Sequence, residues 1–567
     1  MESIKVYLSD WQFNAGIVGL CNILEYANEE VIVKDQYIEI NLEMLENFEE
    51  KYFNYFIEKY KENTPWYRIV SYKPIMESYI NNNFENFDRK SLETLNEYIR
   101  MVKDYLNRNN YKKVYPFIAE DKDILLLVKE LSTINIRKDD EVEEKIDEVK
   151  DRFQIIEDII KYCDSKDGKK YIAAKGVIYN IINNGWNGVC FLNPQTREHD
   201  VYKDYKEYFV DATIDYLKAD KEKFKYNCFI CDRKIKNMNN DLSFLNNTGF
   251  DVARKSSHVW GFTNDVAICD LCKLVYSCLS AGFTYAYDKG IFINNNTSVE
   301  DLIRINRTLR DDVLKNDDNN NRSLTYRALV NSINEQHSHK MQYQLQDIQI
   351  IRYEDEKYRF NILSKEALRV IRESKSELNS LMKTGYREVK TYFNIYDITL
   401  DRLLNNYNMF TLIHKLLVYK ITNSQSITTY YHTGHIMNLI IININYLKGV
   451  EGLDRLKDNK EIVKKARAYG YYLRQEYLKL DPEADKGKIR GISYRLLNAL
   501  KTRNTEMFMH NIVTTYMYVG KTIPSNLTMA LESEEELGII GYAFVTGLNS
   551  GGEYKDEEGK GGENSEN

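Results

Sequence analysis

CFIC at residues 228–231 and CDLC at residues 269–272 are the two stretches that decide how the middle of this chain folds. Each is a C-x-x-C turn, which points two thiolates at one pair of corners of a tetrahedron, so two such turns complete a four-sulfur zinc site. Four unrelated buried thiols are the alternative, which the matched spacings disfavour. We therefore predict one Zn²⁺ ion bound by Cys228, Cys231, Cys269 and Cys272.

The segment between the two pairs is longer than in a minimal zinc ribbon. It contains an Asn-rich loop, Asn237 to Asn247, whose composition cannot supply a core of its own. Because four thiolates leave no open position for water or substrate, the zinc is expected to stabilise the fold and not to catalyse. His258 and Cys278 lie near enough to replace a ligand, but Cys278 falls in an apolar, helix-like run and is expected to be packed.

Length and composition are those of an ordinary globular protein with several domains. The chain has 567 residues, of which 43% are hydrophobic and 29% charged, and about 100–200 residues per domain predicts three or four units. The N-terminal sequence has no secretion signal, and eight cysteines are too few for a disulfide framework. We expect a reducing, cytoplasmic location.

No membrane-spanning segment is predicted. The longest apolar run, Ile436 to Leu447, is interrupted by asparagines and is shorter than the ~20 residues that span a bilayer. This run is expected to form a buried helix.

The fold class is predicted to be α+β and multidomain, with a mixed α/β N-terminal domain, a zinc-finger insertion and a mainly helical C-terminal bundle. Val31 to Ile40 is β-like, Leu42 to Tyr60 is amphipathic, and a strand is expected at Tyr358 to Leu363 after a polar loop at Asn316 to Arg322. The predicted parts are an N-terminal α+β domain at 1–220, a zinc-finger module at 221–290, a middle α+β region at 291–440, a C-terminal helical bundle at 441–548 and a disordered tail at 549–567.

The C-terminal part is basic although the chain carries a net charge of -7. Between Leu453 and Leu527, fifteen lysines and arginines stand against eight acidic residues. On a helix over 460–480, one apolar face consists of Ile462, Ala466, Tyr469, Leu473, Tyr477 and Leu480. The opposite side carries Lys460, Lys464, Arg467 and Arg474.

The next predicted helix has the same arrangement. Ile489, Leu496 and Leu500 share one face, and Arg490, Tyr494 and Lys501 lie across from them. Such cationic stripes can neutralise phosphates, and tyrosines can stack on bases, although a merely solvated face is the plain alternative. The candidate nucleic-acid-binding residues here are Lys460, Lys464, Arg467, Arg474, Arg490, Arg495, Lys501 and Arg503.

No complete catalytic motif stands out. His199-Asp200 could begin a metal-dependent phosphohydrolase site, but the further ligands cannot be assembled from the sequence. His432-x-x-His435 and His337-x-His339 lack the i, i+4 spacing with a glutamate that zinc hydrolases use. Walker, dinucleotide-binding and G-x-S-x-G motifs are absent from the sequence. We therefore expect a binding protein and not an enzyme.

Taken together, five stretches resemble the CRISPR-associated CXXC-CXXC family, the large subunits of type I-B Cascade. They are the two cysteine motifs, KLVYSCLSAGFTYAY after the second motif, DWQFNAGIVG at residues 10–19 and RNTEMFMHNIVTTYMYVGKTIP at residues 503–524. The resemblance covers most of the chain, with little contribution from residues 291–440.

The resemblance implies a non-catalytic subunit of an RNA-guided antiviral surveillance complex, in which guide pairing reads the target and a protein subunit reads the short flanking motif, the PAM. The N-terminal domain is the family's candidate reader, and Gln12, Asn14 and Lys5 are the polar residues nearest its signature. Trp11 and Gly16 are expected to be packing and turn residues.

The C-terminal bundle would correspond to a Cascade small subunit lining the path of the DNA strands. The implied partners are CRISPR RNA, target double-stranded DNA, the Cascade backbone and small subunits, and a recruited helicase-nuclease that cleaves the target. Two other functions stay open from the residues: a metal-dependent nuclease that uses His199 and Asp200, and a free-standing zinc-finger DNA-binding regulator.

Overall fold

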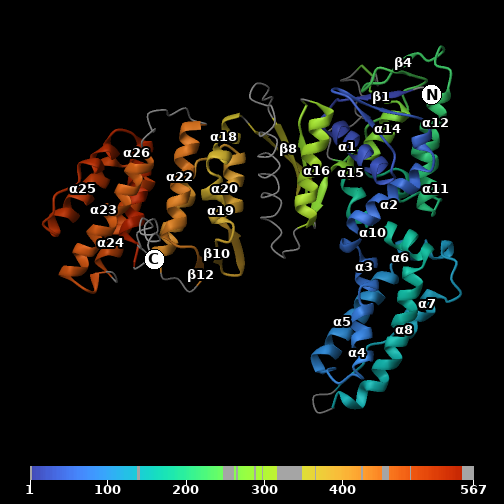
Figure 1. The fold of residues 1–567 in the computed structure, drawn as a ribbon, viewed down its shortest axis with the longest axis horizontal. Helices are drawn as coiled ribbons and strands as arrows, with labels where there is room; N and C mark the ends of the chain where they lie inside the picture. The colour runs from blue at the N-terminus through green and yellow to red at the C-terminus, as the bar shows by residue number, and fades with distance from the viewer. Residues whose placement is uncertain are drawn as a thin grey trace, which may run out of the picture. The chain divides into compact units, whose positions relative to one another are not determined.

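The computed structural model divides into two units, which we describe separately. Unit 1 comprises Met1–Arg310 and Ile350–Phe360, and unit 2 comprises Asp311–Gln349 and Asn361–Asn567. The structure describes residues 3–136, 141–246, 261–262, 266–286, 289–296, 298–315, 348–354, 356–363, 365–422, 426–449, 459–484 and 487–551. Helices and small sheets occur in both units, so the predicted α+β class is confirmed (Figure 1).

Two helices that lie far apart in sequence form the centre of unit 1. They are α1 (Trp11–Tyr26) and α14 (Asp270–Ser277), which is continued by α15 (Leu279–Gly282). A Cβ atom at Gly19 would lie 2.0 Å from the carbonyl oxygen of Cys278, and one at Gly282 would lie 2.0 Å from that of Ala15. The helices therefore pack backbone against backbone, which only glycine allows at these two positions.

Buried aromatic side chains attach the neighbouring helices to α14. The carbonyl oxygen of Ser277 accepts hydrogen bonds from the Tyr52 hydroxyl at 2.9 Å and from the Trp186 indole N–H at 3.0 Å, and its hydroxyl pairs with that of Tyr205 at 2.7 Å. Tyr52 belongs to α2 (Phe48–Tyr60) and Tyr205 to α11 (Val201–Tyr205). The helix that follows the second cysteine pair is thus part of the main core.

The remaining helices of unit 1 include a group that packs around α8. Their cores are rich in Phe and Tyr, with Phe84, Phe87 and Phe153 in mutual edge or tilted contact. The full set of remaining α-helices in the described part of unit 1 is α3 (Pro65–Val70), α4 (Lys73–Asn81), α5 (Arg89–Leu106), α6 (Asn109–Lys112), α7 (Ile124–Glu130), α8 (Ile146–Asp164), α9 (Lys166–Gly168), α10 (Ala174–Asn180), α12 (Ala212–Lys218) and α16 (Val299–Lys315).

The described strands of unit 1 form three small sheets. In the first, β1 (Ile4–Tyr7) and β2 (Ile32–Val33) both pair antiparallel with β3 (Tyr37–Ile40). A second pairs β4 (Tyr226–Asn227) with β5 (Lys234–Ile235). The third has the order β6-β7-β8-β9, from Thr284–Ala286, Lys289–Asn294, Ile348–Glu354 and Lys357–Leu363.

Unit 2 is mainly helical, with one three-stranded sheet of order β11-β10-β12. Its strands are β10 (Gly385–Glu388), β11 (Thr391–Asn394) and β12 (Ile427–Tyr430), and its helices are α18 (Lys365–Glu373), α19 (Lys375–Leu381), α20 (Ile395–Leu404), α21 (Phe410–Ile421), α22 (Thr433–Gly449), α23 (Asn459–Leu480), α24 (Lys488–Lys501), α25 (Thr505–Tyr518) and α26 (Glu534–Leu548). In the red part of Figure 1, α23 and α26 lie side by side.

Several sequence expectations are confirmed. The run Ile436 to Leu447 lies within the buried helix α22, the strand expected at Tyr358 to Leu363 is β9, and residues 460–548 are almost wholly helical in their described parts. Among the described residues, no helix is long and apolar enough to cross a membrane. The polar loop at Asn316 to Arg322, and residues 552–567 of the tail, lie outside the described residues.

Two local expectations need correction. The β-like run Val31 to Ile40 forms two strands, β2 and β3, and the amphipathic stretch from Leu42 becomes α-helical only at Phe48. On α23, Leu480 is 60% exposed although the apolar period assigns it to the buried face, because it is the last residue of the helix. The buried face of α23 instead contains Val463, Ala466, Gly470, Leu473 and Tyr477.

Candidate metal centre and nucleic-acid interface

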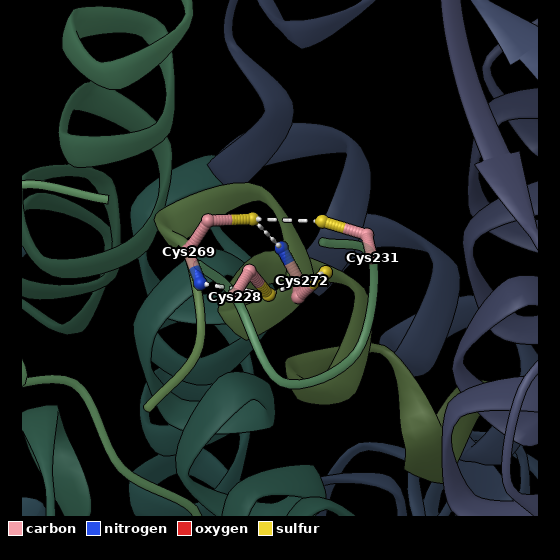
Figure 2. A group of neighbouring side chains, drawn as sticks. All are labelled: Cys228, Cys231, Cys269 and Cys272. Carbon is pink, nitrogen blue, oxygen red and sulfur yellow. Dashed lines mark hydrogen bonds between the residues drawn. The ribbon is translucent and has the colours of Figure 1, made fainter. Parts of the chain in front are cut away.

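The four cysteine side chains predicted to bind zinc converge on one point (Figure 2). Their sulfur atoms all lie within 4.8 Å of one another. The Sγ atoms of Cys228 and Cys272 are 3.8 Å apart, and those of Cys231 and Cys269 are 3.6 Å apart. All four are free thiols, so no disulfide occupies the site.

The first pair sits at the tip of a tight hairpin between β4 and β5. The Cys228 N–H donates to the Arg233 carbonyl at 2.8 Å, and the Asp232 N–H donates to the Cys228 carbonyl at 2.9 Å. Asp232 has a φ of 59°, and the Asn227 side-chain amide donates to its carboxylate at 2.8 Å. These bonds close the turn that brings Cys228 and Cys231 to the same side.

The second pair is held at the start of α14. Cys269 is the N-cap residue, and its sulfur accepts from the Cys272 N–H at 3.4 Å, while the Cys269 N–H donates to the Cys228 sulfur at 3.2 Å. A helix N-terminus offers unpaired N–H groups and a positive dipole end, which stabilise thiolates. The pair therefore faces a favourable field even before any metal is considered.

Hydrogen bonds among the four sulfur atoms shift the pKa values of the thiols in different directions. Contacts from Cys228, Cys269 and Cys272 lower the pKa of the Cys231 thiol well below its usual range. The contacts with Cys228 and Cys231 raise the pKa values of the Cys269 and Cys272 thiols. For Cys228, the contact with Cys231 raises the pKa of the thiol, but the contacts with Cys269 and Cys272 lower it, with the net result of about 7. Two thiolates are thus stabilised by their neighbours, and a cation at the centre would stabilise all four.

The residues fit a zinc ion. Zn–S bonds of ~2.3 Å in a tetrahedron give sulfur–sulfur edges of about 3.8 Å, and the two closest pairs lie at 3.8 and 3.6 Å. Four soft sulfur donors in tetrahedral arrangement are typical of zinc or an iron–sulfur centre, and burial of three of the four cysteines suits a structural role. Across the described part of the chain, no second group of three or more potential ligands gathers closely enough to hold a metal.

Two further residues, Cys278 and His258, were possible replacement ligands for the metal. Cys278 is fully buried, and its thiol donates to the Leu274 carbonyl at 3.4 Å, so the expectation that it is packed is confirmed. Burial raises the pKa of the Cys278 thiol well above its ordinary range. His258 lies outside the described residues.

Both amides expected to read DNA are buried. Asn14 donates to the side-chain oxygens of Asn294 at 3.0 Å and Asn296 at 2.9 Å, and its own oxygen accepts from the Ser9 N–H at 2.8 Å. Gln12 donates to the Asn246 carbonyl at 3.5 Å. These bonds tie the start of α1 to distant segments and argue against direct contact of either amide with a nucleic acid. Lys5, by contrast, is exposed.

The cations predicted on α23 differ in exposure. Lys460 and Lys464 are exposed, whereas Arg467 and Arg474 are half-buried. A Cβ atom at Gly551 would lie 3.5 Å from a terminal guanidinium nitrogen of Arg474, which places that side chain beside the end of the described chain. Lys460 and Lys464 are therefore the residues of this stripe best placed to meet a phosphate.

The faces predicted for α24 are confirmed. Ile489, Leu496 and Leu500 are buried, while Tyr494, Arg495 and Lys501 are exposed and Arg490 is half-exposed. Lys501 lines a cavity of about 560 Å³ together with Arg503, which forms an ion pair with Glu534. Whether these cations bind nucleic acid stays a prediction.

The histidine motifs do not assemble a catalytic centre in the described residues. The Asp200 carboxylate is the N-cap of α11 and accepts from the Tyr202 and Lys203 N–H groups at 3.0 and 3.3 Å. His432 and His435 lie ring against ring, with centroids 3.7 Å apart, but they belong to no group of three potential metal ligands among the described residues. His337 and His339 lie outside the described residues.

One group of charged residues beside the metal site was not among the predicted binding residues. The stretch KEKFKYNCFICDRKIK at 221–236 has six cations and two acidic residues. The sequence feature that could have identified this group is the local positive charge around the first cysteine pair. The net negative charge of the whole chain hides it.

The fold and the site together define a mixed α+β protein in which four cysteines, placed so that they could hold a metal ion, are built into the main core. Residues 220–284, which contain both cysteine pairs and α14, match the family model described as CRISPR-associated protein (Cas_CXXC_CXXC). This match supports the resemblance drawn from the motifs. No curated protein and no solved structure matches the chain.

Proposed function

We propose that this protein is the non-catalytic large subunit of a type I-B CRISPR RNA-guided surveillance complex, Cascade, in the cytoplasm. It recognises the protospacer-adjacent motif and stabilises unwinding of the target DNA, and a recruited helicase-nuclease makes the cut. The observation that carries the proposal is the match of residues 220–284 to a CRISPR-associated family, over a segment in which all four cysteines converge.

The metal supplies structure and not chemistry in this proposal. Zinc bound by four thiolates has no open coordination position, so it cannot activate water. Cys228, Cys231, Cys269 and Cys272 would hold the ion and thereby fix the start of α14, which packs against α1 at the centre of unit 1. Loss of the ion would loosen the N-terminal domain that is proposed to read the flanking motif.

The C-terminal helices are the proposed path for the DNA strands. Exposed cations on α23 and α24 would neutralise phosphates, with a binding constant that falls steeply as salt rises. Guide pairing would supply the sequence specificity, with CRISPR RNA, backbone subunits and small subunits as partners. Gln12 and Asn14 are not part of this proposal, because they are buried and hydrogen-bonded.

Purification of the tagged protein from its native cells tests the proposal. A Cascade subunit co-purifies with backbone subunits and a small RNA of uniform length, and the complex binds duplex DNA that carries a matching target. Recovery of the protein free of RNA, with sequence-specific binding to duplex DNA, would instead identify a zinc-finger regulator. Cleavage of DNA by the purified chain in Mg²⁺ or Mn²⁺ would identify a nuclease.

A further inference from the structure

The hairpin that carries the first cysteine pair exposes two aromatic rings. Phe229, between the two cysteines, is 62% exposed, and Tyr226 on β4 is 46% exposed. Ile230 packs against the core, so the turn sends one apolar side chain inward and one outward. An exposed phenylalanine costs solvation free energy unless a partner covers it.

Cations lie close to these two rings in the sequence. The hairpin segment 221–236 carries a net charge of +4, in a chain whose net charge is -7. Its exposed lysines are Lys223, Lys225, Lys234 and Lys236. None of these four forms an ion pair with a carboxylate in the described part of the protein, unlike Lys479, which pairs with Glu476 at 2.7 Å. In the described part of the protein these four ammonium groups are therefore not tied to a carboxylate and can meet a phosphate.

The hairpin tip is also fixed in place. The Phe229 N–H donates to the Ala267 carbonyl at 2.8 Å, just before the second cysteine pair, and the two flanking cysteines point into the metal site. At the base of the turn, the Arg233 guanidinium donates to the Lys5 carbonyl of β1. A ring held on a rigid tip loses little conformational freedom when a partner stacks on it.

The surface extends onto the first sheet. Lys5 and Tyr7 lie on the same side of β1, opposite the buried Val6, and Tyr7 is exposed and contacts the ring of Tyr37. The Lys5 ammonium group lies 4.9 Å from the centre of that ring. The bond from Arg233 to Lys5 joins the hairpin to β1, where the rings of Tyr7 and Tyr37 continue the aromatic surface and the Lys5 charge is paired with Glu39 at 3.9 Å.

We propose that this hairpin surface, defined by Phe229, Tyr226, Lys225 and Lys234, binds a single strand of DNA, with one unpaired base stacked on Phe229. Exposed rings on a cationic surface are the combination that grips single strands, because rings stack on bases and cations neutralise phosphates. The inference rests on the proposed function, which requires an opened target duplex, and assigns the metal-bound hairpin a direct role in holding one separated strand.

The test uses the full-length, zinc-loaded protein and a fluorescent oligo-dT strand, with affinity measured by anisotropy at several salt concentrations. Phe229→Ala should weaken binding roughly tenfold or more, within the range of one base–aromatic stack, and leave the salt dependence unchanged. The double variant Lys225→Glu, Lys234→Glu should weaken binding and also flatten the salt dependence. Tyr407→Ala is the control, because it removes a ring of similar exposure, 61%, from unit 2.

Each variant is checked for zinc content and for its circular dichroism spectrum. A second readout needs no variant: an oligonucleotide with 5-iododeoxyuridine should photocrosslink to the peptide that contains Phe229. Equal binding by the wild type and Phe229→Ala, or crosslinks confined to other peptides, would overturn the inference while leaving the Cascade proposal standing. The inference would also be overturned if the wild type did not bind the DNA strand, or if it bound oligo-U RNA but not oligo-dT. The Cascade proposal is judged separately, by co-purification with guide RNA.

Discussion

Gly470 of α23 lies directly against the carbonyl oxygen of Phe544 in α26: a Cβ atom at Gly470 would be 2.0 Å from that oxygen. The reciprocal approach occurs at Gly547, where a Cβ atom would be 1.9 Å from the Arg467 carbonyl oxygen. Two glycines thus allow the helices to pack backbone against backbone. This packing fixes the helix that carries Lys460 and Lys464.

Gly470→Ala is expected to destabilise the protein by about 1–3 kcal/mol, because the helices must move apart to admit a methyl group. The control is Gly491→Ala on α24, where a Cβ atom meets nothing within 4 Å. That change should stabilise by about 0.5–1 kcal/mol through helix propensity alone. Differential scanning calorimetry of both variants measures the difference, and equal melting temperatures would show that the helices do not pack this tightly.

Cys269→Ala should abolish metal binding and lower the melting temperature sharply. It removes one of four ligands as well as the N-cap of α14, and structural zinc sites contribute several kcal/mol to folding. Cys278→Ala is the matched control, since Cys278 is a buried thiol close in sequence that is not a ligand. Mass spectrometry of the metal should find one zinc per chain in the control and none in Cys269→Ala. Iron in place of zinc would contradict the assignment.

Charge reversal of Lys460, Lys464, Arg490 and Arg495 should weaken the binding of target DNA. Removal of one cation that neutralises a phosphate reduces the slope of log K against log salt by about 0.7–0.9, so removal of four would reduce it by about 3. Lys90→Glu with Lys129→Glu, two exposed cations of unit 1, serves as the control for a general change of charge. An unchanged slope in the fourfold variant would remove the C-terminal helices from the proposed DNA path.

We expect the buried Lys175 to make the free energy of unfolding depend on pH. Burial is the main cause that lowers the pKa of this lysine to about 8, from 10.5. Between these values the unfolded chain binds more protons than the folded one, so the free energy of unfolding rises with pH. From pH 7 to pH 9 the wild type should gain about 1 kcal/mol from this group.

Lys175→Met should lack that gain and should be more stable than the wild type at pH 7, because a neutral side chain removes the cost of burying a charge. Urea unfolding at pH 7, 8 and 9 measures both effects. Parallel curves for the two proteins would show that Lys175 keeps its charge without penalty.

Local sequence patterns predicted the structural features that depend only on residues close in sequence, namely the cysteine turns and the buried helix faces. The spacing of Cys228 with Cys231, and of Cys269 with Cys272, specifies two turns whatever the rest of the chain does. Likewise, the period of apolar residues predicted the buried face of α24, and the apolar run Ile436 to Leu447 predicted the buried helix α22. Helix geometry alone determines which side chains share a face.

Burial of particular polar residues depended on distant partners. Asn14 belongs to a motif that looks accessible in the sequence, yet its amide meets Asn294, 280 residues away. Leu480 matches the apolar period of α23 but lies at the helix end and is exposed. Periodicity gives the face of a helix, whereas the neighbouring elements decide how far that face is covered.

By itself the sequence determined which four cysteines come together, the α+β class and the basic character of the C-terminal helices. Only the tertiary structure decided that the second cysteine pair opens a core helix, that Gln12 and Asn14 are internal, and that Phe229 projects from the hairpin of the first cysteine pair. The physical reason is range: thiol spacing and helix period act over a few residues, while burial and exposure are set by contacts between segments hundreds of residues apart.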